Sequence, residues 1–101
     1  MKKAEKIETA TRIIREEIDP KELGITGSGT PKNPLQIETY GNNAWGYGWN
    51  AVVDSNKGKI IDVDGYGRYQ EIDGNVNWVK EVAEKLIKAN ILNFTLHVVI
   101  E

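Results

Sequence analysis

The sequence of 101 residues contains no cysteine. Disulfides, thiolate metal sites and cysteine nucleophiles are therefore excluded. The chain also lacks an excess of charge of one sign, since 13 Lys and Arg residues stand against 15 Asp and Glu and give a net charge of −2. This balance predicts no general attraction to nucleic acid or to an acidic membrane surface. With 40% hydrophobic and 28% charged residues the composition is that of a globular protein, which excludes a wholly disordered chain.

Long apolar runs are missing as well. The most apolar stretch, residues 91–100, is about half as long as a membrane-spanning helix, and it alternates like a strand. Residues 1–8 are charged where a secretory signal needs an apolar segment. We therefore expect a cytoplasmic protein without membrane contact. The length predicts a single domain over residues 1–101, large enough for one modest core.

Two amphipathic helices are expected. The first covers residues 3–18 and ends there because Pro20 disfavours helical geometry in the residue before it. The second begins with Asp73 or Asn75 as its N-cap, and Asn90 is expected to close it in the left-handed conformation. The apolar stripes at helical spacing are Ile7, Ala10, Ile14 and Ile18 in the first helix, and Trp78, Val79, Val82, Ala83, Leu86 and Ile87 in the second.

Alternating apolar residues predict strands at residues 35–40 and 92–100, with a β-hairpin between them. Residues 19–34 are rich in Gly and Pro and are expected to form a long loop. The resulting order α-β-β-β-α-β indicates an α+β domain, in which two helices pack on one face of a mainly antiparallel four-stranded sheet. The predicted core consists of Ile14, Ile18, Ala51, Val53, Val63, Val82, Leu86, Phe94, Leu96 and Val98.

The hairpin of residues 45–69 contains two Gly-Tyr-Gly triplets, at 46–48 and 65–67. A three-residue loop with Gly58 in the left-handed position is a favoured hairpin connection. This loop sets a register that buries one coherent apolar face and places large aromatic rings opposite glycines. The predicted pairs are Ser55 with Lys59, Val53 with Ile61, Ala51 with Val63, Trp49 with Gly65, Tyr47 with Gly67, and Trp45 with Tyr69.

The open end and the outer face of this hairpin are the predicted binding surface. Exposed Tyr and Arg residues are typical of protein interfaces, because they combine contact area with hydrogen bonding. The chain is therefore interpreted as a small non-enzymatic protein that binds a protein partner and needs no cofactor, such as a regulator, an inhibitor or an immunity-type protein. The predicted binding residues are Trp45, Tyr47, Tyr66, Arg68 and Tyr69, with Asp62 and Asp64 as charged neighbours.

Three alternatives stay open. Aromatic side chains on the sheet could stack the bases of a nucleic acid or a nucleotide, although Asp62 and Asp64 would repel phosphates. The same two carboxylates with Asn50 suit a metal-dependent hydrolase. Residues 62–73 also resemble an EF-hand calcium loop, with acids at positions one, three and twelve and glycine at six, but Tyr66 stands where an oxygen ligand is needed.

Three smaller features of the sequence concern a loop, the histidine and the last strand. Residues 27–32 are superficially similar to a phosphate-binding loop, but Pro31 and Pro34 exclude the helix that must follow one. The single histidine, His97, is expected to have a structural role in the last strand. If that strand lies at the edge of the sheet, its unpaired groups allow a homodimer through strand addition.

Overall fold

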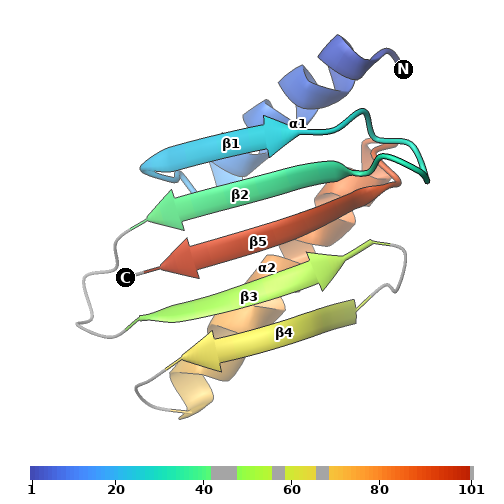
Figure 1. Cartoon of the computed structure of the whole chain (residues 1–101). Coiled ribbons are helices and arrows are strands. Elements are labelled where there is room, and N and C mark those ends of the chain that lie inside the picture. The colour runs from blue at the N-terminus through green and yellow to red at the C-terminus, as the bar shows by residue number, and fades with distance from the viewer. Residues whose placement is uncertain (42–47, 56–58, 66–68, 101) are drawn as a thin grey trace.

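The computed structural model describes residues 1–41, 48–55, 59–65 and 69–100, and of residues 59–65 and 69–76 it describes the backbone alone. Within these residues, two helices and five strands follow one another along the chain. They are α1 (Lys3–Glu17), β1 (Glu22–Thr26), β2 (Leu35–Gly41), β3 (Trp49–Asp54), β4 (Lys59–Gly65), α2 (Tyr69–Lys88) and β5 (Phe94–Ile100). Both helices lie behind the same face of a single sheet (Figure 1), which confirms the predicted α+β architecture.

The C-terminal strand β5 lies in the centre of the sheet, whose order is β1-β2-β5-β3-β4. It pairs in parallel with β2, where Leu35 lies opposite Phe94 and Gly41 opposite Ile100. It pairs antiparallel with β3. The hairpin β1–β2 and the hairpin β3–β4 are therefore joined through β5 (Figure 1). Because both edges of β5 are already hydrogen-bonded, the strand does not lie at an edge of the sheet, and the condition for the predicted homodimer is not met.

Strand β1 lies in the segment that was predicted to be a loop. It pairs antiparallel with β2, from Glu22 opposite Tyr40 to Thr26 opposite Gln36. Its half-buried residues alternate with exposed ones, as expected for a strand covered on one side. The sheet thus has five strands instead of four, and it remains mainly antiparallel because only the β2–β5 pairing is parallel.

The loop between β1 and β2 is closed by its own hydrogen bonds. The backbone N–H groups of Ser28, Gly29 and Thr30 all donate to the carbonyl oxygen of Asn33, at 3.1, 2.9 and 3.2 Å. Lys6 of α1 donates from Nζ to the carbonyl oxygen of Gly29 at 3.0 Å. Successive N–H groups that converge on one point can bind an anion, but here the carbonyl oxygen of the chain itself takes that position. This arrangement agrees with the rejection of a phosphate-binding loop.

The β3–β4 hairpin has the predicted register at one end and a different one at the other. Trp49 lies opposite Gly65 and Ala51 opposite Val63, as predicted. The register shifts between Val52 and Val53, so that Val53 lies opposite Ile60 and Asp54 opposite Lys59. The predicted pairs Val53–Ile61 and Ser55–Lys59 are therefore wrong. A bulge of this kind inserts one extra residue into one strand, which a loop-based register does not anticipate.

The helix boundaries confirm some predictions and correct others. The positive φ of 51° at Asp19 follows the end of α1, and Asn90 closes α2 with the predicted positive φ, at 67°. However, α2 begins at Tyr69, before the predicted caps. Tyr69 is thus a helical residue, and its predicted strand pairing with Trp45 is wrong. At the other end of α2, Leu92 is exposed and precedes β5.

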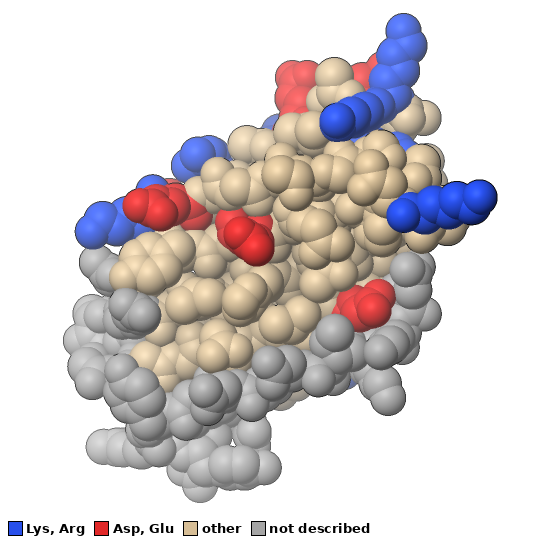
Figure 2. All heavy atoms as spheres, viewed as in Figure 1, with Lys and Arg blue, Asp and Glu red and all other residues tan. Residues whose placement is uncertain are grey.

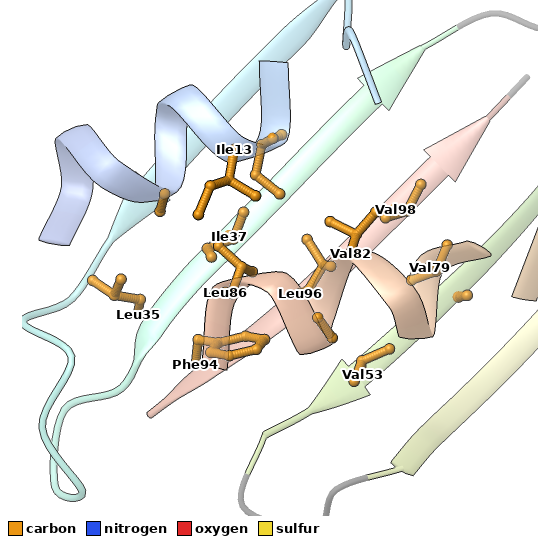
Figure 3. Close-up of a cluster of buried hydrophobic side chains, with 14 of the residues drawn as sticks. Ile13, Leu35, Ile37, Val53, Val79, Val82, Leu86, Phe94, Leu96 and Val98 are labelled. Carbon is orange, nitrogen blue, oxygen red and sulfur yellow. The ribbon is translucent and has the colours of Figure 1, made fainter. Parts of the chain in front are cut away.

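One apolar layer between the sheet and the helices forms the core. Figure 3 shows Ile13 of α1 and Leu86 of α2 directed toward Ile37 and Leu96 of the sheet. Of the predicted core residues, Ile18 is partly buried, and the side chain of Val63 lies outside the described residues. The other predicted core residues are buried: Ile14, Ala51, Val53, Val82, Leu86, Phe94, Leu96 and Val98.

The burial of Trp49 yields a first prediction. Its side chain is 5% exposed, so Trp49→Ala should lower the free energy of unfolding by about 3–5 kcal/mol, the usual cost of truncating a buried aromatic residue. The matched control is Leu92→Ala, because Leu92 is 54% exposed and should cost about 0.5 kcal/mol or less. Urea denaturation of both variants measures the difference. Equal stabilities would show that Trp49 does not belong to the core.

Gly27 yields a second prediction. It has a φ of +91°, and a Cβ at this position would lie 2.1 Å from the carbonyl oxygen of Pro34. Gly27→Ala should therefore lower the free energy of unfolding by about 2–4 kcal/mol, through backbone strain and the clash. Gly24→Ala is the control, since a Cβ there meets no atom within 4 Å. Thermal melting should separate the two variants, and a Gly27→Ala protein as stable as the wild type would contradict the prediction.

Candidate functional site

The face of the sheet opposite the helices is uncovered in the part of the chain that the structure describes (Figure 1). Alternate residues of each strand point to this side, because successive side chains of a strand point to opposite faces. We call the described residues of this side the open face. Its exposed members are Glu22, Gly24, Thr26, Gln36 and Glu38, and its half-buried members are Tyr40, Asn50, Val52, Asp54, Thr95, His97 and Val99.

Strand register arranges the open face in rows that cross the sheet. Residues far apart in the sequence become direct neighbours in this way, since each row takes one residue from each of four strands. One row is Gly24, Glu38, His97 and Val52, and the next is Glu22, Tyr40, Val99 and Asn50.

A hollow of about 430 Å³ opens on this face over β1, β2 and β5. The residues of the open face that line it are Glu22, Gly24, Glu38, Tyr40, His97 and Val99. Gly24 leaves part of this space empty, because a Cβ built on it would meet no heavy atom within 4 Å. The volume lies within the range of about 300–1,000 Å³ that small-molecule pockets occupy, so the hollow can hold one side chain of a partner.

The charged side chains of the open face are all acidic: Glu22, Glu38 and Asp54. Figure 2 shows red carboxylates over the β1–β2 side of this face and a broad uncharged area beside them, with blue basic side chains at the margins. Glu22 and Glu38 are diagonal neighbours across the β1–β2 pair, since Glu22 pairs with Tyr40 and Glu38 with Gly24. Diagonal positions of this kind lie about 7–8 Å apart. The hollow therefore has two carboxylates at its border, and it favours a cation.

The structure places the predicted binding residues only in part. Trp45, Tyr47, Tyr66 and Arg68 lie outside the described residues. Asp62 and Asp64 belong to β4, at the register positions opposite Val52 and Asn50, so they continue the two rows of the open face by one strand. Tyr69 is the first residue of α2. A binding role for these residues stays a prediction.

The geometry does not support the calcium-loop resemblance of residues 62–73. The stretch begins inside strand β4 and ends inside helix α2, whereas an EF-hand loop connects two helices. Among the described residues, no group of three or more His, Asp or Glu side chains is arranged to hold a metal ion. The metal-hydrolase alternative depends on the side chains of Asp62 and Asp64, which lie outside the described part of the structure, so it stays a prediction.

Sequence analysis missed the hollow because part of its lining lies in β1. Glu22 and Gly24 lie in the segment whose composition predicts a loop, and the sequence predicts a structural role for His97. The signal that was present is the alternation of Leu23 and Ile25 with polar or small residues, which places Glu22 and Gly24 on the same side of a strand.

Comparison with known proteins gives no direct guide to the function. The chain matches no protein-family model, no curated protein and no solved structure. Within the described residues, neither helix has the length and apolar character that a membrane crossing requires.

The empty space above Gly24 yields a third prediction. Glycine destabilises the interior of a strand, whereas threonine has a high strand propensity. Strand propensities span about 1 kcal/mol between residue types. Because Gly24 has no positive φ and a Cβ there meets no atom, Gly24→Thr should raise the free energy of unfolding by up to about 1 kcal/mol. Urea denaturation checks this change. A clear loss of stability would mean that packing within the chain requires the glycine.

Proposed function

We propose that this protein is a small non-enzymatic binding module that recognises a protein partner through the open face of its sheet. The observation that carries the proposal is the mixed chemistry of this face. Half-buried Tyr40, Val52 and Val99 lie beside exposed carboxylates. Protein interfaces typically combine a less polar centre with a polar, hydrated rim.

The apolar members of the open face form one continuous strip. Tyr40 lies directly opposite Val99 across β2 and β5, and Val52 lies opposite His97 across β3 and β5. Val99 and Val52 are thus diagonal neighbours on adjacent strands. A tyrosine at the end of such a strip offers both contact area and a hydroxyl group, the combination that is enriched among the residues that dominate binding energy.

The charge of the open face favours a protein over a nucleic acid. Glu22, Glu38 and Asp54 are its charged side chains, and the described Lys and Arg side chains lie on other parts of the chain. A phosphate backbone is repelled by such a surface, whereas nucleic-acid interfaces owe most of their affinity to Lys and Arg. A partner with basic side chains would be attracted to it.

The predicted aromatic residues extend this proposal beyond the described residues. Asp62 and Asp64 continue the rows of the open face through β4, and Tyr66 and Arg68 follow β4 directly in sequence. In the proposed function they form the far side of the same interface. A regulator, inhibitor or immunity-type protein acts in this way, by occupying the surface of its partner. A cytoplasmic location remains part of the proposal.

A photo-crosslinking experiment tests the proposal and is the fourth prediction. A photoreactive amino acid is placed at Thr95, on the open face but outside the lining of the hollow, and at exposed Glu81 on α2 as the matched control. Irradiation in the native host should give a discrete protein adduct from Thr95 and none from Glu81. Melting temperatures establish that both variants fold.

The captured protein is then purified and titrated against the wild type and Val52→Glu. A new charge in the apolar strip should weaken binding at least about tenfold. Equal adducts from both positions, or an adduct that nuclease treatment removes, would contradict the proposal. The second result would favour the nucleic-acid alternative.

A further inference from the structure

We infer that the hollow beside Gly24 receives an arginine side chain of the protein partner. This inference rests on the proposed function and specifies the chemistry that the partner must present. Four features of the hollow carry it: the unused space at Gly24, the two carboxylates at its border, the aromatic ring of Tyr40, and its position at the end of the apolar strip.

The space above Gly24 is not explained by packing within the chain. A glycine inside a strand weakens it, and it usually marks a bulge, a tight bend or a close approach of another group. Strand β1 pairs with β2 in an unbroken register, so Gly24 marks no bulge. Gly24 has no positive φ, and no heavy atom lies within 4 Å of a Cβ built on it. No described residue fills this space, which is therefore open to a group of the partner.

The charge at the border of the hollow defines that group as a cation. Glu38 lies directly opposite Gly24, and Glu22 lies two residues before Gly24 on the same side of β1. Like charges at neighbouring positions of a sheet repel each other, so a cation between them relieves a cost that the free protein carries. No described residue provides an ion pair to either carboxylate.

Arginine fits these features better than lysine or a metal ion. Its planar guanidinium group bonds a carboxylate through two parallel hydrogen bonds and stacks on aromatic rings, here those of Tyr40 and His97. Lysine presents a compact point charge, which has no planar group to stack on a ring and cannot form the two parallel hydrogen bonds. A metal ion needs several ligands converging on one point, and the described residues offer no such group.

The hollow also lies where a specificity contact is expected. Tyr40 and Val99 belong both to its lining and to the apolar strip, so an arginine in the hollow and apolar residues over the strip could come from one partner surface. Charged contacts at the rim of an interface fix its register and select the partner, while the apolar centre supplies most of the affinity.

The test is a titration of the ¹⁵N-labelled protein with N-acetyl-L-arginine amide, followed by amide chemical shifts. We expect saturable shifts at Gly24, Glu38 and His97. The isosteric but uncharged N-acetyl-L-citrulline amide should give none. Gly24→Thr, which places a side chain in the part of the hollow above Gly24, and Glu38→Gln, which removes one charge, should each weaken binding of the arginine probe about tenfold.

A matched control distinguishes the hollow from general acidity. Glu84→Gln removes an exposed carboxylate on α2 and should leave binding of the probe unchanged. Absence of saturable shifts, equal binding of the citrulline probe, or equal loss in Glu84→Gln would each overturn the inference. Thr95 lies outside the hollow, so its partner adduct reports on the proposed function alone. An adduct from Thr95 without arginine binding would overturn this inference and leave the binding module intact.

Discussion

The structure depends on the burial of apolar surface on one side of the sheet only. Two helices suffice to cover one face of five strands, and a chain of this size can bury only about two-thirds of its surface. Leu35, Ile37, Leu96 and Val98 are fully buried on the helix side, while their immediate neighbours remain accessible on the other. The open face is therefore a direct result of having one core layer. Any binding function on the sheet must use the residues that this layer leaves out.

Much of the fold was predictable because its signals are periodic. The apolar stripes gave both helices, and alternation gave β2, β3 and β5, since burial on one side imposes these periods. Two kinds of feature were not predictable. Strand β1 has five residues with Gly24 in the middle, which is too short for alternation to stand out from loop composition. The central place of β5 and the shift after Val52 are set by pairing between distant segments, for which a single sequence holds no signal.

The candidate site was even less predictable, for the same physical reason. Glu22, Glu38 and His97 come from three strands, and only strand order brings them into one hollow. The sequence instead predicts a binding surface at the aromatic residues of the hairpin, because aromatic residues next to glycines can be recognised from the local sequence alone. Gly24 gives no such signal, because a glycine in a Gly-rich segment predicts a turn. In a regular strand, however, a glycine that no neighbouring atom requires lowers the stability of the strand and leaves its backbone accessible to a ligand.

The central position of β5 has a consequence for how the protein is made. The strand that joins both hairpins is synthesised after them, because β5 follows β1–β2 and β3–β4 in the sequence. Until it emerges, the inner edges of β2 and β3 are unpaired, and nascent chains with such edges are prone to aggregate. The sheet can then close only after β5 has been synthesised. A chain that stops before β5 would thus lack the strand that connects the two hairpins.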